Sequence, residues 1–393
     1  MRKALLISCF DWYKSRLQPI REILIGKGYS VTVLEADFDH IKKAPLTNRY
    51  PECTYVYVPR YKNNVSVSRI ISHLKFGSTV AKRIKQWKPD LIYLQIPPNN
   101  TARYCRKYKA RHSEIKLILD IIDLWPESMP LGRVKNTPIS WVWKKWRNDA
   151  IAVADHVFTE CGSYQSKFRD VLDKSKISTL YLFKEQTQEE RALVKEIMGR
   201  KEMGEQDKLG KRDKANSHAV KFAYLGSMNH IIDIDGICNV IRKFQDSGYL
   251  CELYAIGDGE SKKRFERMVQ DVGCITHFYG LVFDEMEKIK ILAPCDYAFN
   301  MMKGYISVGL TIKSIDYLSY GLPLINNIKG DTARIIKNGR IGINVDKDIP
   351  SADLIKRLDS DKYNMGCRAF HIYNRLFSKM NFVETSGNIM EDV

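Results

Sequence analysis

The sequence predicts an α/β protein of two domains, each a parallel sheet wound with helices on both faces. Its length, 393 residues, exceeds the size that a single hydrophobic core usually serves. Short apolar strands alternate with helical patterns through both halves, and this alternation is typical of parallel sheets covered by helices. A charged, polar stretch, residues 184–219, separates the two series. We therefore expect a first domain over 1–183, a linker or insertion over 184–219, a second domain over 220–360, and a C-terminal helical segment over 361–393.

The first series begins with a strand at residues 4–8, a helix at 17–28 and a strand at 30–34. A strand at 54–58, a helix at 70–87, a strand at 91–94, a helix near 100–111 and strands at 116–122 and 155–160 follow. The linker is expected to contain a helical piece near 189–198. The second series places strands at 220–225, 251–256, 275–279 and 297–301, and helices at 234–246, 262–272 and 284–292. A last long helix is expected near 363–380, where it would cross back to the first domain.

Nearly all of the net positive charge lies in the first half. Residues 1–180 contain 32 Lys and Arg against 16 Asp and Glu, which accounts for +16 of the total +17. A basic half indicates an anionic partner, either nucleic acid or an anionic membrane surface. No run approaches the roughly 18 apolar residues of a membrane-spanning helix, and residues 1–9 read as a strand rather than a secretion signal.

The nine cysteines contain no Cys-x-x-Cys pair and no zinc-type spacing with histidine. This argues against a metal site and against a disulfide framework. An odd number of unpaired thiols suits a reducing compartment. We therefore expect a cytoplasmic protein that uses no metal.

Residues 307–325 combine a glycine-bearing loop, a short amphipathic helix and a small apolar strand. Apolar residues three apart, at 312, 315 and 318, share one face of the helix. Gly321 provides a left-handed cap and Pro323 prevents the helix from continuing. On this pattern alone, the helix is a capped, half-buried structural element or the start of a binding site.

The start of that helix has features that suit a phosphate. Gly309 and Thr311 are small residues that let a ligand approach backbone N–H groups, and Lys313 adds a full positive charge in the first turn. Asp316, one turn further along, could accept hydrogen bonds from sugar hydroxyls.

Two segments of the first half are candidates for binding. Asp123, in the run Leu-Asp-Ile-Ile-Asp-Leu-Trp-Pro-Glu-Ser over 119–128, stands at a strand end where a carboxylate could bind a sugar hydroxyl or take a proton. It could equally cap the turn. In residues 141–147 three tryptophans alternate with basic residues, a mixture typical of a membrane-interface helix. A packed helix with a solvated rim has the same composition, and the basic charge of this half favours membrane contact.

Glycine turns follow the expected strands of the second half. Gly226-Ser227-Met228-Asn229 and Gly257-Asp258-Gly259 both connect a strand to a helix and could lie against phosphates. There is no Gly-x-Gly-x-x-Gly and no Walker-type Gly-Lys-Thr, which excludes the usual dinucleotide and P-loop signatures.

Taken in order, these motifs resemble the GT-B glycosyltransferases, and more narrowly their retaining family 4. The resemblance rests on Tyr224-Leu225-Gly226-Ser227, Ile256-Gly257-Asp258-Gly259, Phe278-Tyr279-Gly280, and Lys313…Asp316-Tyr317…Gly321-Leu322-Pro323. Asp123-Leu124-Trp125-Pro126-Glu127-Ser128 is similar to a loop of bacterial members that build capsule and O-antigen. The resemblance spans the chain outside 184–219. It implies two Rossmann-like domains facing a central cleft, with the acceptor in the first and a nucleotide sugar in the second.

The resemblance also assigns residues. In the family a Glu-x7-Glu signature binds the donor, and its second acid, which grips the ribose, corresponds here to Asp316. The first acid corresponds to Val308, so backbone N–H groups around Gly309 and Leu310 would hold the sugar instead. The family's diphosphate-binding Arg and Lys are replaced by Ser227 and Asp235, which leaves Lys313 as the leading diphosphate cation.

Lys313 and Asp123 are therefore the expected catalytic residues, although Ile122 replaces the His of the family's His-Asp pair. The backbone around Phe278, Tyr279 and Gly280 is expected to read the base. The expected donor-binding set is Gly226, Ser227, Asn229, Gly257, Phe278, Tyr279, Val308, Gly309, Leu310, Thr311, Lys313 and Asp316.

The resulting expectation is a metal-independent glycosyltransferase without a cofactor, transferring a sugar from a nucleotide diphosphate, UDP foremost, with retention. Its acceptor would be a saccharide or a lipid-linked saccharide in capsule, exopolysaccharide or O-antigen synthesis, at the cytoplasmic face of the membrane and without nucleic acid. One alternative is a basic nucleic-acid-binding protein, against which stands the lack of zinc-finger, helix-turn-helix or RNP-like signatures. The other is a catalytically inactive GT-B partner subunit, which the missing acid at Val308 suggests.

Overall fold

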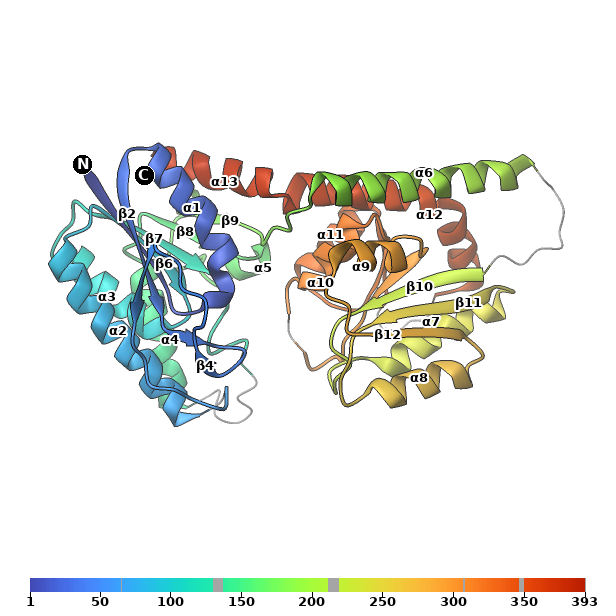
Figure 1. Ribbon diagram of the computed structural model, residues 1–393, viewed down its shortest axis with the longest axis horizontal. Helices are drawn as coiled ribbons and strands as arrows, with labels where there is room; N and C mark the ends of the chain where they lie inside the picture. The colour runs from blue at the N-terminus through green and yellow to red at the C-terminus, as the bar shows by residue number, and fades with distance from the viewer. Residues whose placement is uncertain (65, 130–136, 211–218, 307, 346–349, 393) are drawn as a thin grey trace. The chain divides into compact units, whose positions relative to one another are not determined.

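The computed structural model describes residues 1–64, 66–129, 137–210, 219–306, 308–345 and 350–392 (Figure 1). Ser307, residues 211–218 of the expected linker and residues 346–349 of the expected second domain lie outside these ranges. The chain forms two compact units. The first consists of Met1–Leu182 together with Phe382–Val393, and the second of Phe183–Asn381.

The first unit is built on a seven-stranded sheet in the order β5-β2-β1-β6-β7-β8-β9. Every neighbouring pair in it is parallel. The strands are β1 (Arg2–Ser8), β2 (Tyr29–Ala36), β5 (Cys53–Val56), β6 (Leu91–Ile96), β7 (Lys116–Ile121), β8 (His156–Thr159) and β9 (Ile177–Thr179), and a short antiparallel pair, β3 (Phe38–Asp39) and β4 (Ala44–Pro45), stands apart. A parallel sheet must be covered on both faces, which explains the near-continuous apolar runs of β1, β6 and β7.

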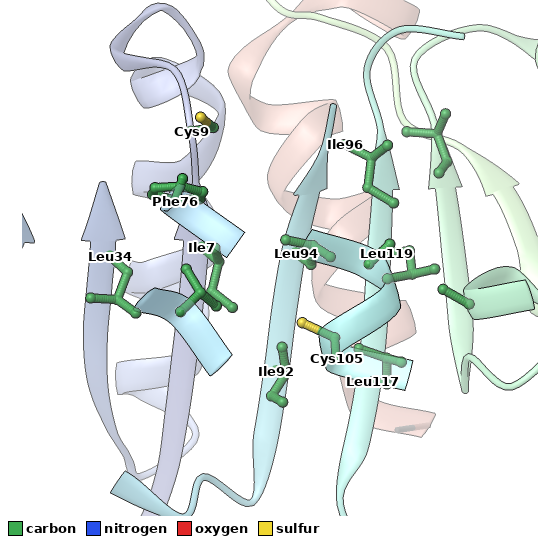
Figure 2. Packing of buried hydrophobic residues seen from close by; sticks show 14 of the residues in the cluster. Ile7, Cys9, Leu34, Phe76, Ile92, Leu94, Ile96, Cys105, Leu117 and Leu119 are labelled. Carbon is green, nitrogen blue, oxygen red and sulfur yellow. The ribbon is translucent and has the colours of Figure 1, made fainter. Parts of the chain in front are cut away.

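Helices supply that cover. They are α1 (Lys14–Gly26), α2 (Val67–Trp87), α3 (Asn99–Lys109), α4 (Pro138–Ile151), the short α5 (Gly162–Gln165) and, at the chain end, α13 (Lys379–Asp392). α2, α3 and α4 lie side by side in that order (Figure 1). Figure 2 shows Phe76 of α2 and Cys105 of α3 against strand residues that include Ile7, Leu94 and Leu119, all buried. The core therefore fixes the sheet and leaves its carboxyl edge to the loops.

The second unit repeats the plan with six parallel strands in the order β12-β11-β10-β13-β14-β15. The strands are β10 (Ala219–Leu225), β11 (Leu250–Ile256), β12 (Ile275–Gly280), β13 (Tyr297–Asn300), β14 (Leu324–Asn326) and β15 (Gly342–Asn344). The helices are α6 (Gln188–Gly210), α7 (Ile234–Asp246), α8 (Lys262–Asp271), α9 (Glu285–Leu292), α10 (Ile312–Ser319), α11 (Asp331–Gly339) and α12 (Ala352–Ile372). Two doubly wound parallel sheets confirm the predicted fold class.

The segment expected to be a linker contributes a long helix to the second unit. α6 extends from Gln188 to Gly210, well beyond the expected helical piece, and packs along α12 (Figure 1). Its Val194 is fully buried. The polar composition that suggested a linker belongs to the exposed face of a docked helix.

The prediction of a single helix near 363–380 is wrong. The structure has α12, a π-helical turn over Tyr373–Phe377, and α13, with Ser378 between them in an extended conformation. Ser378 Oγ donates to the carbonyl of Asn374 at 2.7 Å and accepts from the backbone N–H of Asn381 at 3.3 Å. The serine thus ends one helix and caps the next.

Candidate active site

In the second unit, the loops that follow β10, β11 and β12 are joined backbone to backbone at the carboxyl edge of the sheet. Gly226 N–H donates to the carbonyl of Ile256 at 3.0 Å, and Gly257 N–H to that of Gly280 at 2.7 Å. Gly257 has a φ of 143°, and a Cβ there would lie 1.9 Å from the carbonyl oxygen of Gly226. Only glycine permits this approach. Ligands of parallel sheets bind at this edge.

The start of α10 is fixed by a ladder of asparagines on neighbouring strands. Asn300, Asn326 and Asn344 are paired in register at the ends of β13, β14 and β15. Asn300 Nδ2 donates to Asn326 Oδ1 at 2.9 Å, and Asn326 Nδ2 donates to Asn344 Oδ1 at 2.8 Å. Thr311 Oγ1 donates to Asn300 Oδ1 at 3.0 Å and caps the helix by accepting from the N–H of Ser314.

Several backbone N–H groups at the start of α10 are available to bind a ligand. Those of Gly309, Leu310, Ile312 and Lys313 have no acceptor among the residues that the structure describes. The loop itself is held because Thr332, at the start of α11, donates to the carbonyl of Gly309 at 3.0 Å from its backbone N–H. A fixed loop with unused N–H groups ahead of a helix suits an anion.

Lys313 supplies a cation at the same place. Its side chain is half-buried, and its Nζ lies 5.3 Å from the centroid of the Tyr224 ring. Within the described part of the chain, no carboxylate or other hydrogen-bond acceptor contacts this ammonium. Burial lowers the pKa of Lys313 to about 8. An ammonium without a protein partner is available to a phosphate.

Asp316, expected to bind the ribose, lies one turn further along but already has a cation. Lys184 Nζ donates to Asp316 Oδ1 at 2.7 Å and also contacts Glu285. Burial alone would raise the pKa of Glu285, but the Lys184 ammonium and hydrogen bonds from Lys184 and Tyr320 hold it below its usual value. Asp316 Oδ2 has no partner among the described residues.

The other expected donor residues lie at the same edge of the sheet. Ser227 is exposed, and its carbonyl accepts a hydrogen bond from the Tyr224 hydroxyl at 2.9 Å. Asn229 Oδ1 accepts one from the N–H of Ile231 at 3.1 Å.

The residues expected to read the base are aromatic. Phe278 packs edge-on against Phe265, and Tyr279 is 45% exposed. Val308 is half-buried in the loop before α10. No finding assigns a ligand to any of them, so the expected donor set stays a prediction.

The first unit contains a pocket of about 330 Å³ at the carboxyl edge of its own sheet. It is lined by Phe10, Tyr13, His40, Ile41, Arg69, Asp123 and Trp125. These residues come from the loops after β1, β3 and β7 and from the first turn of α2. Asp123, one of the two expected catalytic residues, thus lines this pocket. The alternative expectation, that it caps a turn, is also partly met, since Asp123 Oδ2 accepts from Trp125 Nε1 at 2.7 Å.

Two other acidic residues of the 119–128 run are structural. Asp120 is fully buried and forms a bidentate ion pair with Arg16, with both contacts at 2.7 Å. Glu127 binds the buried Arg147 of α4 through two contacts of 2.8 Å. Trp141 is 64% exposed on the same helix. The tryptophan-rich segment therefore combines a packed face with an exposed aromatic.

Sequence reasoning missed Glu160 and Arg69. Burial, followed by the Asp123 and Asp120 carboxylates, raises the pKa of Glu160 to about 8, against the lowering effect of Arg16. Glu160 directly follows β8, the strand next to β7, and that position is a signal the sequence offered. Arg69 offered none, because a basic residue in the first turn of a helix is commonplace.

No disulfide joins any of the nine cysteines. Among the described residues, no three His, Cys, Asp or Glu side chains are grouped so as to hold a metal ion. Across the same residues, no helix has an apolar stretch long enough to cross a membrane.

No protein-family model matches the sequence, and a search of curated proteins finds no sequence match either. Solved structures do resemble the fold. WaaB, a lipopolysaccharide outer core galactosyltransferase in its apo form, is 14% identical with a TM-score of 0.62 over 100% of both chains. A glycosyltransferase from Rickettsia africae is 12% identical with a TM-score of 0.60, over 100% of this chain and 98% of the other. HepE of Anabaena, in complex with UDP and glucose, is 11% identical with a TM-score of 0.59 over 100% of both chains.

These likenesses extend over whole chains, and together with the two parallel sheets they define the class of protein. The chain has the GT-B fold. At this level of identity the likeness establishes the fold alone.

Proposed function

We propose that this protein is a glycosyltransferase that moves a sugar from a nucleotide diphosphate, UDP foremost, to a saccharide or lipid-linked saccharide acceptor. The observation that carries the proposal is Lys313, whose ammonium has no hydrogen-bond or ion-pair partner among the described residues. It lies beside N–H groups at the start of α10 that have no acceptor in the same part of the chain. Similar folds in solved structures include a galactosyltransferase and a protein holding UDP and glucose, which supports this class over a nucleic-acid-binding protein.

The chemistry follows from where charge develops. Breaking the anomeric C–O bond leaves negative charge on the diphosphate, and a prepositioned helix start with Lys313 stabilises it. The Thr311–Asn300 hydrogen bond holds this helix start in place before the donor arrives. We propose that transfer proceeds with retention and without a metal, as in the family 4 enzymes that the motifs resemble. The Asp123 loop supports a place in capsule, exopolysaccharide or O-antigen synthesis.

The test is donor binding and turnover. A panel of UDP-, GDP- and dTDP-sugars is screened by thermal shift, because a ligand that binds only the native state raises the melting temperature. We expect a UDP-sugar to give the largest shift. Lys313→Ala is expected to lower UDP release from that donor on the order of a hundredfold to a thousandfold.

The matched control is Lys356→Ala, which removes an exposed lysine from α12 of the same unit and should leave turnover unchanged. Full activity in a folded Lys313→Ala variant would contradict the proposed mechanism. Binding of a donor without any hydrolysis or transfer would favour the inactive partner subunit.

We also propose that the first unit associates with an anionic membrane surface from the cytoplasmic side. α2 exposes Val67, Ile71 and Leu74 along one face, at 72%, 50% and 42%, and α4 exposes Ile139 and Trp141 at 60% and 64%. Lys144 and Lys145, each 52% exposed, flank the α4 residues. Apolar side chains beside cations suit an interface of acyl chains and anionic headgroups.

Vesicle co-sedimentation tests this association. We expect binding to vesicles with 30% phosphatidylglycerol, roughly an order of magnitude weaker binding to phosphatidylcholine alone, and loss of binding in an Ile71→Ser, Trp141→Ser double variant. Equal binding of the double variant and the wild type would reject this surface.

A further inference from the structure

Arg69 is a buried cation that has no acidic partner in the described part of the chain. It lies in the first turn of α2, is 6% exposed and lines the 330 Å³ pocket. Its Nη1 donates to the carbonyl of Asn64 at 2.7 Å, and its Nε has no hydrogen-bond partner in the described part of the protein. No Asp or Glu among the described residues forms an ion pair with it. A buried charge left unpaired costs several kcal/mol, which is of the order that a bound anion can offset.

A second cation, Lys43, lies close to Arg69. Lys43 Nζ and the Arg69 guanidinium lie 5.2 and 5.6 Å from the centroid of the same Tyr61 ring. Burial, then Arg69 and Lys43, lowers the pKa of His40 to about 4, so this pocket residue is neutral at physiological pH. The carboxylate in the wall, Asp123, is hydrogen bonded to Trp125. Arg69 and Lys43 thus place two cations around Tyr61 at one end of the pocket, which favours an anion there.

The walls of the pocket suit a sugar ring. The Arg69 guanidinium lies over Trp125, 4.3 Å from the ring centroid, and Phe10 meets Trp125 edge-on at 6.0 Å between centroids. Tyr13 adds a further aromatic wall. The volume falls within the roughly 300–1,000 Å³ of small-molecule sites, and aromatic walls with a few placed polar groups are typical of them.

We propose that this pocket binds the acceptor through an anionic group on a saccharide, a carboxylate or a phosphate, paired with Arg69 while the sugar ring lies against the aromatic walls. The proposal rests on the proposed function, since it names the acceptor of that transferase. A guanidinium matches both oxyanions, because each offers two oxygens to its paired N–H donors. The carboxylate would belong to an acidic sugar, and the phosphate to a sugar phosphate or to the head of a lipid-linked saccharide.

The test is calorimetric titration of the intact protein with four probes in the absence of donor: glucuronate, glucose 6-phosphate, glucose and inorganic phosphate. We expect at least one of the two anionic sugars to bind on the order of tenfold or more tightly than glucose and than inorganic phosphate. A preference for glucuronate would identify an acidic sugar, and a preference for glucose 6-phosphate would identify a phosphate. Equal binding of glucose, or binding of inorganic phosphate as tight as that of both anionic sugars, would overturn the proposal.

Variants then assign the preference to Arg69. Arg69→Gln is expected to abolish the advantage of the anionic sugar, and Arg69→Lys to keep part of it. Arg83→Gln makes the same charge change at an exposed position of the same helix and should leave the advantage intact. Retention of the advantage in a folded Arg69→Gln protein would reject Arg69. If that variant does not fold, the wild-type comparison of charged and neutral sugars still decides.

Donor turnover separates the two proposals. Acceptor binding is measured without any nucleotide sugar, so an anionic preference can be absent while UDP release from the donor is normal, which would overturn only this inference. Absence of both donor binding and turnover would overturn the proposed function itself.

Discussion

Lys184 Nζ donates a hydrogen bond to Asp316 Oδ1 at 2.7 Å, and the same ammonium contacts Glu285. Lys184 is the second residue of the second unit, and its backbone N–H donates to the carbonyl of Phe377 at 2.9 Å, four residues before that unit ends. Asp316, the carboxylate predicted to bind the ribose, is thus oriented by a lysine near the first residue of the second unit. The same lysine is hydrogen bonded to a residue near the end of that unit.

Replacing that lysine should affect both stability and donor binding. Lys184→Met leaves Asp316, about one-fifth exposed, without a cation among the described residues. It also removes one of the two cations of Glu285, which keeps Lys288 at 3.2 Å. We expect a loss of about 2 kcal/mol in the free energy of unfolding at pH 7, below the 3–5 kcal/mol of a fully buried pair, and a raised KM for the donor. Denaturant titration and initial rates measure the two effects.

The stability loss should depend on pH in a known direction. Because the pKa of Glu285 is lowered in the folded protein, its contribution is present above the ordinary value of 4.5 and is lost as the pH falls below it. The difference between Lys184→Met and wild type should therefore shrink toward pH 3. Lys243→Met, which removes an exposed i,i+3 pair with Asp246, is the control and should cost less than about 0.5 kcal/mol. A cost as small for Lys184→Met would contradict this account.

Donor affinity should fall as the pH rises through the pKa of Lys313. Burial places this pKa near 8, so the unliganded ammonium is largely protonated at pH 7 and largely neutral at pH 9.5. We expect the Kd of the UDP-sugar to rise over that interval by about tenfold or more, since a charged hydrogen bond to phosphate is lost. Calorimetry across this range measures the change.

Lys313→Arg provides the matched comparison. Arginine stays protonated throughout, so whatever affinity it retains should be independent of pH over the same interval. A pH dependence unchanged by this replacement would mean that another group titrates.

Glu160 should make the protein less stable as the pH rises. Its pKa is about 8 in the folded state, against an ordinary value of 4.5, mainly because of burial. Between these values the folded state holds a proton that the unfolded chain has released, so the free energy of unfolding decreases with pH. Glu160→Gln removes this dependence, and its melting temperature relative to wild type should rise from pH 5 to pH 8. A constant difference at the two pH values would show that Glu160 titrates normally.

Gly257→Ala should disrupt the joined loops of the second unit. The added Cβ would lie 1.9 Å from the carbonyl oxygen of Gly226, and the φ of 143° is unfavourable for alanine. We expect a cost of at least about 2 kcal/mol in the free energy of unfolding and weaker donor binding. Gly199→Ala, on α6 with no atom within 4 Å of the added Cβ, should be stabilising by up to about 1 kcal/mol. Equal effects of the two changes in denaturant titration would count against this account.

Local signals predicted much of the fold. The helix over 234–246 and the strand–glycine–helix passages around Gly226 and Gly257 follow from periodicity and turn chemistry, which act over a few residues. The break at Ser378 was missed because a serine suits the interior of a helix or its cap, and its bond to the carbonyl of Asn374 is possible in both cases. The extended backbone of Ser378 and its cap to Asn381 become visible only in the structure.

The sequence by itself determined the two α/β series and the place of Lys313 at a helix start, because both depend on neighbours in the chain. Tertiary structure alone decided that Asp316 is paired with Lys184, 132 residues away, and that Asp120 is a structural partner of Arg16 while Asp123 lines a pocket. It also decided that Arg69 is buried with no acidic partner among the described residues. Charge pairing and burial depend on which distant segments pack together, and a local pattern contains no information about that.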